Sequence, residues 1–557
     1  MESKKNNAAG VVIIVVVLIA IVIAAIVKSG LFGKNGPLSG GISGGDKKEV
    51  STLIKRVKYD TKDPVKGSVD LSQASLYDEI PNINKYPLSL ENTTGDINIE
   101  IFASPEKAGE GADSWMVDVA KKYNNENHKI NGKVVKVSIR NISSGVAADY
   151  IISGKYIPTG FSPSSELWGE YASIQGGKLN LIEKSVVKNV PGILISKKTD
   201  YLDYKSIIKD VQEGKINVGY TNPQASTTGM NLLLTILMDA DPDITSDASK
   251  EAFSKFQKNI PYVATNTMQM RDSNASGSLD GMTMEYQSFI QDKELKSNFK
   301  FIPFGVRHDN PMYECSGLND DKKAALEDFT KYCVNDENQK AATNKGFNNN
   351  LDYKSDLKIT GKDVKNALSI YKQEKDGGKS IIAVFVADVS GSMYGEPLNQ
   401  LKSSLSNGMK YINETNQVGL ISYSSTVSIE VPIKKFDLNQ KAFFQGSIDN
   451  MQANGNTASY DALVVAMDMI EKAKKDSPNA KCVIFLLSDG QANTGYNLST
   501  ITPALKKLEI PVYTISYGED ADTNAMQSVS KINEAASIKA DSDDIIYQIK
   551  NLFNSNL

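Results

Sequence analysis

Histidine and cysteine are scarce in this chain, and basic residues are not in excess. Only two histidines, His128 and His308, occur among 557 residues. The sequence therefore offers few candidates for a histidine-based zinc site or for a Ser-His-Asp triad. The formal net charge is −4 and the pI is about 5.6, which argues against a nucleic-acid partner. No other set of residues supports catalysis. We therefore expect a protein that binds rather than an enzyme.

The three cysteines leave one question open. Cys482 lies inside an apolar run and is expected to be a small core residue. Cys315 and Cys333 flank a segment with helical spacing, and they can form a disulfide if this part of the chain lies outside the cytoplasm. The sequence does not give the distance between them, so the bridged and the free forms both remain open.

One long apolar run near the N-terminus predicts a membrane anchor. Residues Ala8 to Val27 contain no charged side chain, and a run of this length spans a bilayer as a single helix. A cleaved signal peptide would have a shorter apolar core and a better cleavage site. We therefore expect an uncleaved signal-anchor helix at 8–28, a single-pass location in the cell membrane, and the bulk of the chain outside the cytoplasm.

Composition changes sharply after the apolar run. Residues 30–45 are rich in glycine, which is typical of a flexible tether. Residues 46–92 are polar and contain three prolines. They predict either an extended stalk or a lead-in packed on the next domain. We assign 29–92 as a flexible linker or stalk. A chain of this length needs more than one hydrophobic core, so two or three domains are expected to follow.

Between residues 93 and 350 the pattern alternates between strand and helix. Strands are predicted at 97–103, 134–139 and 157–161, and helices at 114–123 and 146–152. This rhythm is typical of a parallel α/β sheet. Serine and threonine recur after strands and before helices, where backbone N–H groups and hydroxyls bind anions well. The alternative is ordinary helix capping, which needs no ligand.

The same segment resembles a bacterial extracellular solute-binding protein of the molybdate, sulfate and phosphate type. The matching stretches are IEIFASPEK, GFSPSSELW, VGYTNPQASTTGMNLLL, GMTMEYQSFI and FKFIPFG. The resemblance implies two lobes with a cleft between them, the first lobe being made of 93–165 and 265–350. It also implies a small anionic solute in the cleft. The candidate ligand-binding residues are Ser104, Ser162, Ser164, Thr227, Thr228 and Tyr286.

Residues 351–378 are predicted to form a connecting helix, and 379–557 a doubly wound α/β domain. The domain opens with the apolar run Ile381 to Ala387, as expected for a central strand of a parallel sheet. The run ends in Asp-x-Ser-x-Ser, at the strand end where open α/β sheets bind ligands. One carboxylate and two hydroxyls on a tight turn are oxygen ligands that hard divalent cations prefer.

Two later motifs complete the pattern. GNTASYDAL places a threonine at the start of a helix, and the apolar run CVIFLL ends in Ser-Asp-Gly. Each motif alone is common turn chemistry, but the three in this order resemble a von Willebrand factor A domain. The resemblance implies a metal-ion-dependent adhesion site for Mg²⁺, or for Mn²⁺ or Ca²⁺, whose coordination is completed by an acidic residue of a protein partner. The implied metal-site residues are Asp388, Ser390, Ser392, Thr457 and Asp489.

These expectations describe a membrane-anchored adhesion protein that recognises a partner through a bound cation. Tyr394, Glu396 and the loop near Asn454 are expected to surround the metal site. Two alternatives remain open. One is an oxyanion-type solute receptor whose C-terminal domain mediates assembly or signalling. The other is an adaptor of a ring-shaped AAA+ ATPase on the cytoplasmic side of the membrane.

Overall fold

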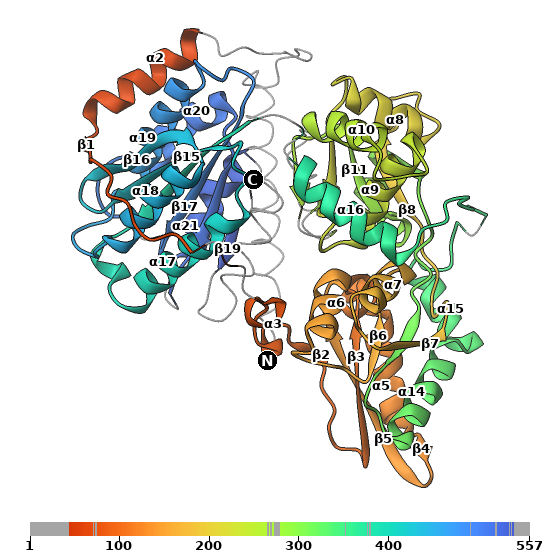
Figure 1. Cartoon of the computed structure of the whole chain (residues 1–557). Helices are drawn as coiled ribbons and strands as arrows, with labels where there is room; N and C mark the ends of the chain where they lie inside the picture. The colour runs from red at the N-terminus through yellow and green to blue at the C-terminus, as the bar shows by residue number, and fades with distance from the viewer. Residues whose placement is uncertain are drawn as a thin grey trace, which may run out of the picture. The chain divides into compact units, whose positions relative to one another are not determined.

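The computed structural model describes most of the chain from residue 44 to residue 539. The gaps are residues 71, 73–74, 265–266, 268–269, 272–278, 351, 376, 378–379, 491, 519–520, 534 and 536. The predicted anchor at 8–28 lies outside the described residues. Within the described part, no helix is long and apolar enough to cross a membrane. Residues 48–557 form one of two units of the chain, and three β-sheets lie in its described part (Figure 1).

The C-terminal sheet has seven strands in the order β1-β16-β15-β14-β17-β18-β19. The central strand β14 pairs in parallel with β15 and β17, whereas β15 and β16 form an antiparallel pair. The parallel arrangement of β14 agrees with the sequence prediction. The strands are β1 (Tyr59–Thr61), β14 (Ile381–Asp388), β15 (Gln417–Tyr423), β16 (Val427–Lys435), β17 (Lys481–Ser488), β18 (Val512–Ser516) and β19 (Ser537–Lys539).

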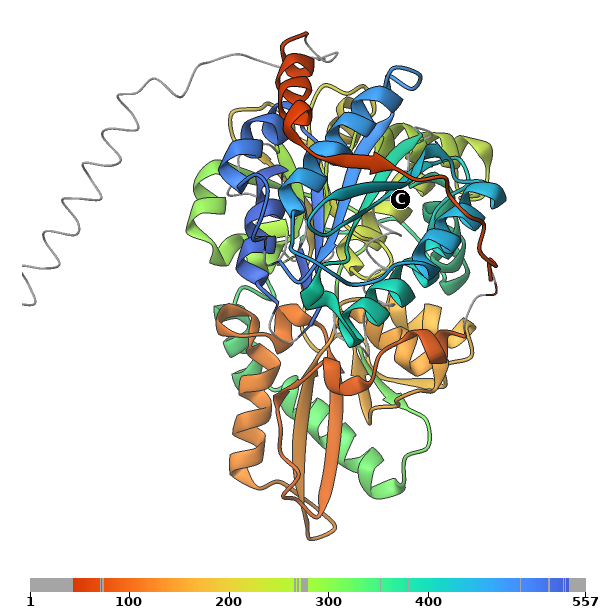
Figure 2. The ribbon, with the colours of Figure 1, turned by 90° about the vertical axis from the view of Figure 1, so that its left-hand side faces the viewer.

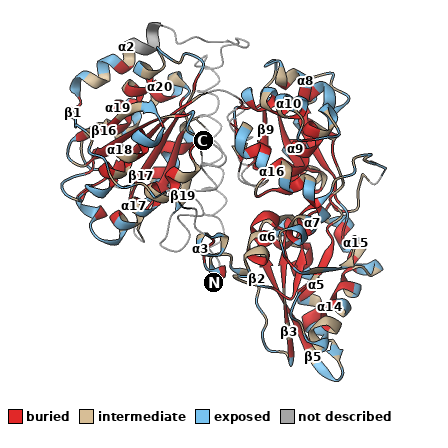
Figure 3. Cartoon of the chain, in the orientation of Figure 1, coloured by how far each residue is buried: buried red, intermediate tan, exposed pale blue. Residues whose placement is uncertain are grey.

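Alternate residues of β14 belong to two cores, one on each face of the sheet. Phe385 packs with α17 and α18 and stacks on Phe485, with 4.9 Å between ring centroids. Val384 and Val386 pack with α19, α20 and α21. Every residue of β14 is buried, and Figure 3 shows buried residues, in red, along the central strands of this sheet. The helices are α17 (Glu396–Gly408), α18 (Leu438–Asp449), α19 (Ser459–Ala473), α20 (Leu498–Leu508) and α21 (Thr523–Ser530).

Residues 48–69 do not form the flexible linker that the sequence predicted for 29–92. Val50, in α2 (Gly44–Leu53), and Val57 belong to the core on the α19 face of the C-terminal sheet. Strand β1 then pairs in parallel with β16, as the red strand in Figure 2 shows. We call residues 58–69 the N-terminal strap. The physical reason for the correction is that β16 would otherwise leave an unpaired edge, which the strap covers.

The first sheet of the middle region has the strand order β2-β5-β3-β6-β13-β7, with β4 paired to β5. Strand β3 is parallel to β5 and β6, as the βαβ pattern predicted. Its strands are β2 (Leu88–Leu90), β3 (Ile97–Ala103), β4 (Lys129–Ile130), β5 (Lys133–Asn141), β6 (Gly160–Ser162), β7 (Leu179–Glu183) and β13 (Met312–Cys315). The nearby helices are α3 (Leu76–Glu79), α4 (Pro105–Ala108), α5 (Trp115–Glu126), α6 (Ser144–Ser153), α7 (Glu166–Ile174), α14 (Asp320–Cys333) and α15 (Asp336–Asn344).

The second sheet of the middle region corrects the predicted lobe boundaries. Its order is β10-β9-β11-β8-β12, so β11 and β12 belong to the second lobe and β7 to the first. Short apolar strands do not reveal which sheet they join, because that depends on long-range pairing. The strands are β8 (Pro191–Ser196), β9 (Val218–Thr221), β10 (Val263–Ala264), β11 (Gly281–Glu285) and β12 (Phe299–Pro303). The helices are α8 (Tyr204–Gln212), α9 (Thr227–Ala240), α10 (Asp247–Lys258), α12 (Tyr286–Gln291) and α13 (Lys293–Asn298).

The predicted connecting helix is α16 (Gly361–Glu374), which begins with a capping box between Thr360 and Asp363. It packs on α7, α9 and α10. Tyr371 is buried in the same core as Phe253, with 6.1 Å between the ring centroids. The helix therefore does more than connect two domains, since its apolar face completes a core.

Both cysteines whose pairing was open are free. Cys315 and Cys333 are buried thiols, and they belong to two different core clusters. Burial raises the pKa of both thiols. They therefore act as small core residues.

Candidate functional sites

Asp388 ends the central strand of the C-terminal sheet and is fully buried. Its Oδ1 accepts a hydrogen bond from the Ser390 N–H at 2.8 Å. Its Oδ2 accepts from the Ser488 hydroxyl at 2.5 Å and from the Tyr423 hydroxyl at 3.2 Å. Burial raises the pKa of Asp388 to about 6, and the negative charge of Asp489 acts in the same direction. The carboxylate is thus oriented by neutral donors at a site that disfavours its negative charge.

The two serines of the first motif lie on the turn that follows Asp388. The Ser390 and Ser392 hydroxyl oxygens are 3.1 Å apart. Ser390 is buried, whereas Ser392 is exposed to solvent. The Gly391 N–H donates to the Gly455 carbonyl at 3.0 Å, which holds this turn against the loop before Thr457. The two hydroxyls therefore lie between the protein interior and solvent, as a cation site requires.

The remaining two predicted metal-site residues lie on neighbouring segments. Thr457 is buried, and its N–H donates to Asn493 Oδ1 at 2.9 Å. Asp489 follows the end of β17 and has 8% of its surface exposed. Strands β14 and β17 pair in parallel, and the Ser488 hydroxyl donates to Asp388, so Asp489 follows the strand next to the one that Asp388 ends. The fold thus brings the strand-end carboxylates and the loop hydroxyls of all three motifs to one edge of the sheet.

The donor chemistry fits a hard divalent cation. The five residues offer two carboxylates and three hydroxyls, all oxygen donors, which suit Mg²⁺, Mn²⁺ or Ca²⁺. Among the residues that the structure describes, no group of three or more His, Cys, Asp or Glu side chains forms a metal site. A cation at this edge would therefore depend on the hydroxyls, and on waters or a partner, to complete its coordination.

The residues expected around the site are accessible. Tyr394 is 81% exposed, and Glu396 and Asn454 are also exposed. The Asn454 N–H donates to the Val389 carbonyl at 2.8 Å, which fixes that loop beside the turn. A partner can therefore approach the Ser392 side of this edge.

The doubly wound sheet with these motifs at its strand ends is the arrangement that the sequence predicted for residues 379–557. Residues 383–553 match the family model of the von Willebrand factor type A domain, so the chain contains such a domain. The bovine inter-alpha-trypsin inhibitor heavy chain H3 is 27% identical over 173 residues, which are 29% of this chain and 19% of that one. A Synechocystis protein is 26% identical over 150 residues, covering 26% and 34% of the two chains. The chain thus spans about a fifth to a third of these relatives.

Solved structures similar to this chain fall into two groups. A periplasmic thiamin binding protein is 13% identical, with 50% of this chain and 96% of that chain covered and a TM-score of 0.39. A sulfate-binding protein from Mycobacterium tuberculosis is 15% identical, with coverages of 45% and 86% and a TM-score of 0.35. A von Willebrand factor type A protein from Catenulispora acidiphila is 16% identical, with coverages of 32% and 42% and a TM-score of 0.29.

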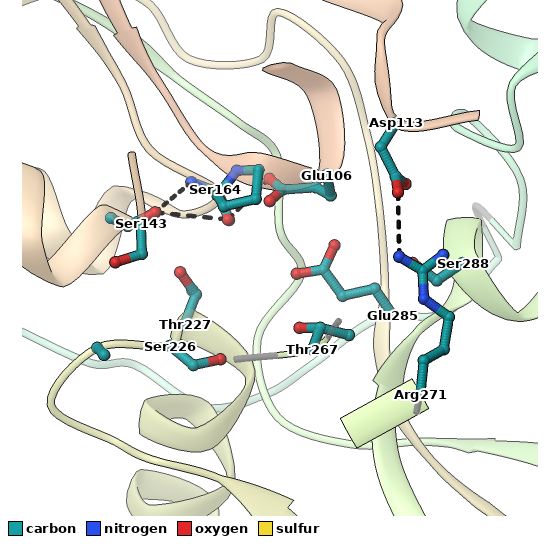
Figure 4. A pocket seen from close by; sticks show the side chains of 13 residues that line it. Glu106, Asp113, Ser143, Ser164, Ser226, Thr227, Thr267, Arg271, Glu285 and Ser288 are labelled. Atoms are coloured by element: carbon teal, nitrogen blue, oxygen red, sulfur yellow. Dashed lines mark hydrogen bonds and ion pairs between the residues drawn. The ribbon is translucent and has the colours of Figure 1, made fainter. Parts of the chain in front are cut away.

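The middle region contains a polar cleft of about 490 Å³. Of the six predicted ligand-binding residues, Ser164 and Thr227 line it (Figure 4). The other four do not. Ser104 donates to Glu106, Ser162 is fully buried, and Thr228 donates weakly to Glu285 at 3.4 Å. The Tyr286 ring packs on Phe301.

Sequence reasoning missed the charged residues of this cleft, Glu106, Asp113, Arg271 and Glu285. Glu106 and Glu285 lie inside two of the matching stretches, IEIFASPEK and GMTMEYQSFI. Glutamate after a strand is usually solvated, so neither one indicates a site by itself. Their burial was the signal that the sequence alone could not supply.

Proposed function

We propose that the protein is a membrane-anchored, extracytoplasmic binding protein that recognises a partner through a divalent cation in its von Willebrand factor type A domain, and that it is not an enzyme. The observation that supports a cation site is the fully buried Asp388 at the end of the central strand. Among the described residues, the partners of its carboxylate are hydroxyls and an N–H group, without positive charge. A bound cation would offset the cost of burying this negative charge.

In this proposal Asp388, Ser390, Ser392, Thr457 and Asp489 would hold Mg²⁺. When bound, the cation would attract an acidic residue of the partner as a further ligand. The chain's own residues orient the site: Ser488 and Tyr423 direct the Asp388 carboxylate, and the Gly391–Gly455 hydrogen bond positions the two loops. Exposed Tyr394 and Glu396 would contact the partner and contribute to its selection.

The test is metal-dependent stabilisation of the full chain. Mg²⁺ at about 100 times its Kd should add about 2.7 kcal/mol to the free energy of unfolding. The double variant Asp388→Ala/Asp489→Ala should lose this gain. A matched control is Asp468→Ala, which removes an aspartate of α19 paired with Lys472 at 2.7 Å. If Mg²⁺ or Mn²⁺ stabilises the double variant as much as the unaltered chain, the proposed site is wrong.

The location is tested separately, by protease treatment of intact cells with detection of the C-terminal domain. Cleavage supports an outward-facing domain. Protection that persists after removal of the cell wall, while a known surface protein is cut, would favour the adaptor role inside the cell.

A second candidate function, solute capture by the middle region, is favoured by the cleft, because carboxylates, hydroxyls and a guanidinium group converge on it.

A further inference from the structure

Two buried glutamates from different elements face the cleft of the middle region. Glu106 lies in the first turn of α4, and Glu285 is the last residue of β11. Figure 4 shows both carboxylates directed into the same space. Only 12% of the Glu106 side chain and 5% of the Glu285 side chain are accessible. Carboxylates this buried are costly unless something in the site stabilises their charge.

The Glu285 carboxylate is hydrogen-bonded by side chains on both of its oxygens. Asn189 Nδ2 donates to one carboxylate oxygen at 2.5 Å, and His308 Nδ1 is 2.9 Å from the other. The other nitrogen of the His308 ring lies near Asn231. The Asn231 amide bonds both the N–H and the carbonyl of Val306, which fixes its orientation, and its Nδ2 lies 3.2 Å from His308 Nε2. His308 Nε2 therefore faces the Asn231 amide, and Nδ1 is the ring nitrogen that faces Glu285.

The positive charges near the cleft are already engaged. Arg271 pairs with Asp113 at 3.1 Å. Lys107 lies behind the cleft with no accessible side-chain surface, 3.5 Å from Glu106 Oε1, and donates to Asn310 at 2.8 Å. The cleft and its immediate surroundings thus contain three carboxylates, from Glu106, Asp113 and Glu285, and two described cations. Burial and the charge of Glu106 raise the pKa of Glu285, while Lys107 acts in the opposite direction.

Hydroxyl groups lie on the other side of the same space. Ser143 and Ser226 precede α6 and α9, and neither caps its helix with its side chain. The Thr227 hydroxyl accepts a hydrogen bond from the Trp168 indole at 3.0 Å. Among the described residues it donates no hydrogen bond to Glu106 or Glu285. This side therefore suits the polar, uncharged part of a ligand.

We propose that the cleft binds a small organic solute with a positively charged nitrogen, held between Glu106 and Glu285, rather than a free oxyanion. An ammonium group would form charge-assisted hydrogen bonds with two carboxylates that are already in place. An oxyanion would instead face both glutamates, and the lining cation Arg271 is paired with Asp113. This inference is independent of the metal site, because the described residues that line the cleft all belong to the middle region.

The test is calorimetric titration of the full chain at constant ionic strength. Ethanolamine, putrescine and choline serve as cationic probes, and sulfate, phosphate and molybdate as anionic probes. We expect saturable binding of at least one cation and of no oxyanion. Glu285→Gln should weaken cation binding at least about tenfold, which corresponds to about 1.4 kcal/mol. If that variant does not fold, Glu106→Gln replaces it, with the same expected loss.

Two further variants separate the outcomes. Arg271→Gln should leave cation binding intact or tighten it, because it removes a positive charge from the lining. Asp388→Ala should not affect binding of the organic cations in the cleft. Loss of the metal site can therefore be distinguished from loss of the cleft site. Saturable oxyanion binding that Arg271→Gln abolishes would overturn the proposal. The proposal would also be overturned if none of the three cations bound at concentrations up to about 10 mM. An ammonium group paired with carboxylates in a preformed site should bind more tightly than that.

Discussion

Gly446, in the middle of α18, is a position where the usual effect of a substitution should be reversed. In a helix interior, Gly→Ala ordinarily stabilises by about 1 kcal/mol. Here a Cβ atom would lie 2.0 Å from the Val65 carbonyl oxygen and 2.6 Å from the Gly67 nitrogen. Both are backbone atoms of the N-terminal strap, so no side-chain rotation relieves the clash. Gly446→Ala should therefore displace the strap from the helix.

The size of the effect follows from the contacts that hold the strap. The Gly67 N–H donates to the Ala442 carbonyl at 2.8 Å. Lys66 Nζ donates to Asn439 at 2.8 Å, and Lys62 pairs with Glu430 at 2.5 Å. Each hydrogen bond contributes about 0.5–1.5 kcal/mol net, and the exposed Lys66 contact contributes less. After the gain in helix propensity is subtracted, we expect a net destabilisation of about 1–2 kcal/mol.

Urea unfolding of the full chain, with hydrogen exchange of residues 59–67, measures both consequences. Exchange of the β1 amides should accelerate in Gly446→Ala. The neighbouring Gln445→Ala is the matched control: its side chain bonds only Asp449 on the same helix among the described residues, so its effect should stay within about 0.5 kcal/mol. Equal or higher stability of Gly446→Ala, with unchanged exchange in β1, would show that the strap does not pack as described.

Three further predictions concern the cores. Phe385→Ala should cost about 3–5 kcal/mol of unfolding free energy in urea, because Phe385 is fully buried and packs on Phe444 and Phe485; a loss below 1 kcal/mol would contradict the packing. Arg140→Ala should cost about 2–3 kcal/mol in the same assay, since the buried guanidinium pairs with Glu100 at 2.7 Å and donates to the Ile83 carbonyl; an unchanged midpoint would refute it. Burial raises the pKa of Cys315 to about 12, so Ellman's reagent at pH 8 should label Cys315 only after unfolding. Rapid labelling of Cys315 in the native chain would count against the fold.

The sequence predicted those parts of the fold that depend on local pattern. The apolar run at 381–387 became the central strand, and the five residues of the three motifs lie at one edge of its sheet. Pairings between distant segments gave no local signal. The three residues of β1 are exposed and polar enough to resemble a linker, and the sheet to which β7 belongs depends on its pairing with β13. The cleft was anticipated through its hydroxyls, but Glu106 and Glu285 became visible only when the fold buried them.

Because β1 pairs with β16, the C-terminal domain contains a strand that is synthesised long before the rest of its sheet. Lys62 and its partner Glu430 are 368 residues apart in the chain. At a synthesis rate of roughly 5–20 residues per second, the strap is therefore synthesised tens of seconds before its partner strand. During that interval the middle region can fold. A piece that begins at residue 379 lacks the strap and leaves the outer edge of β16 open to pairing with other chains. The boundary of the domain in sequence is thus not its boundary in space.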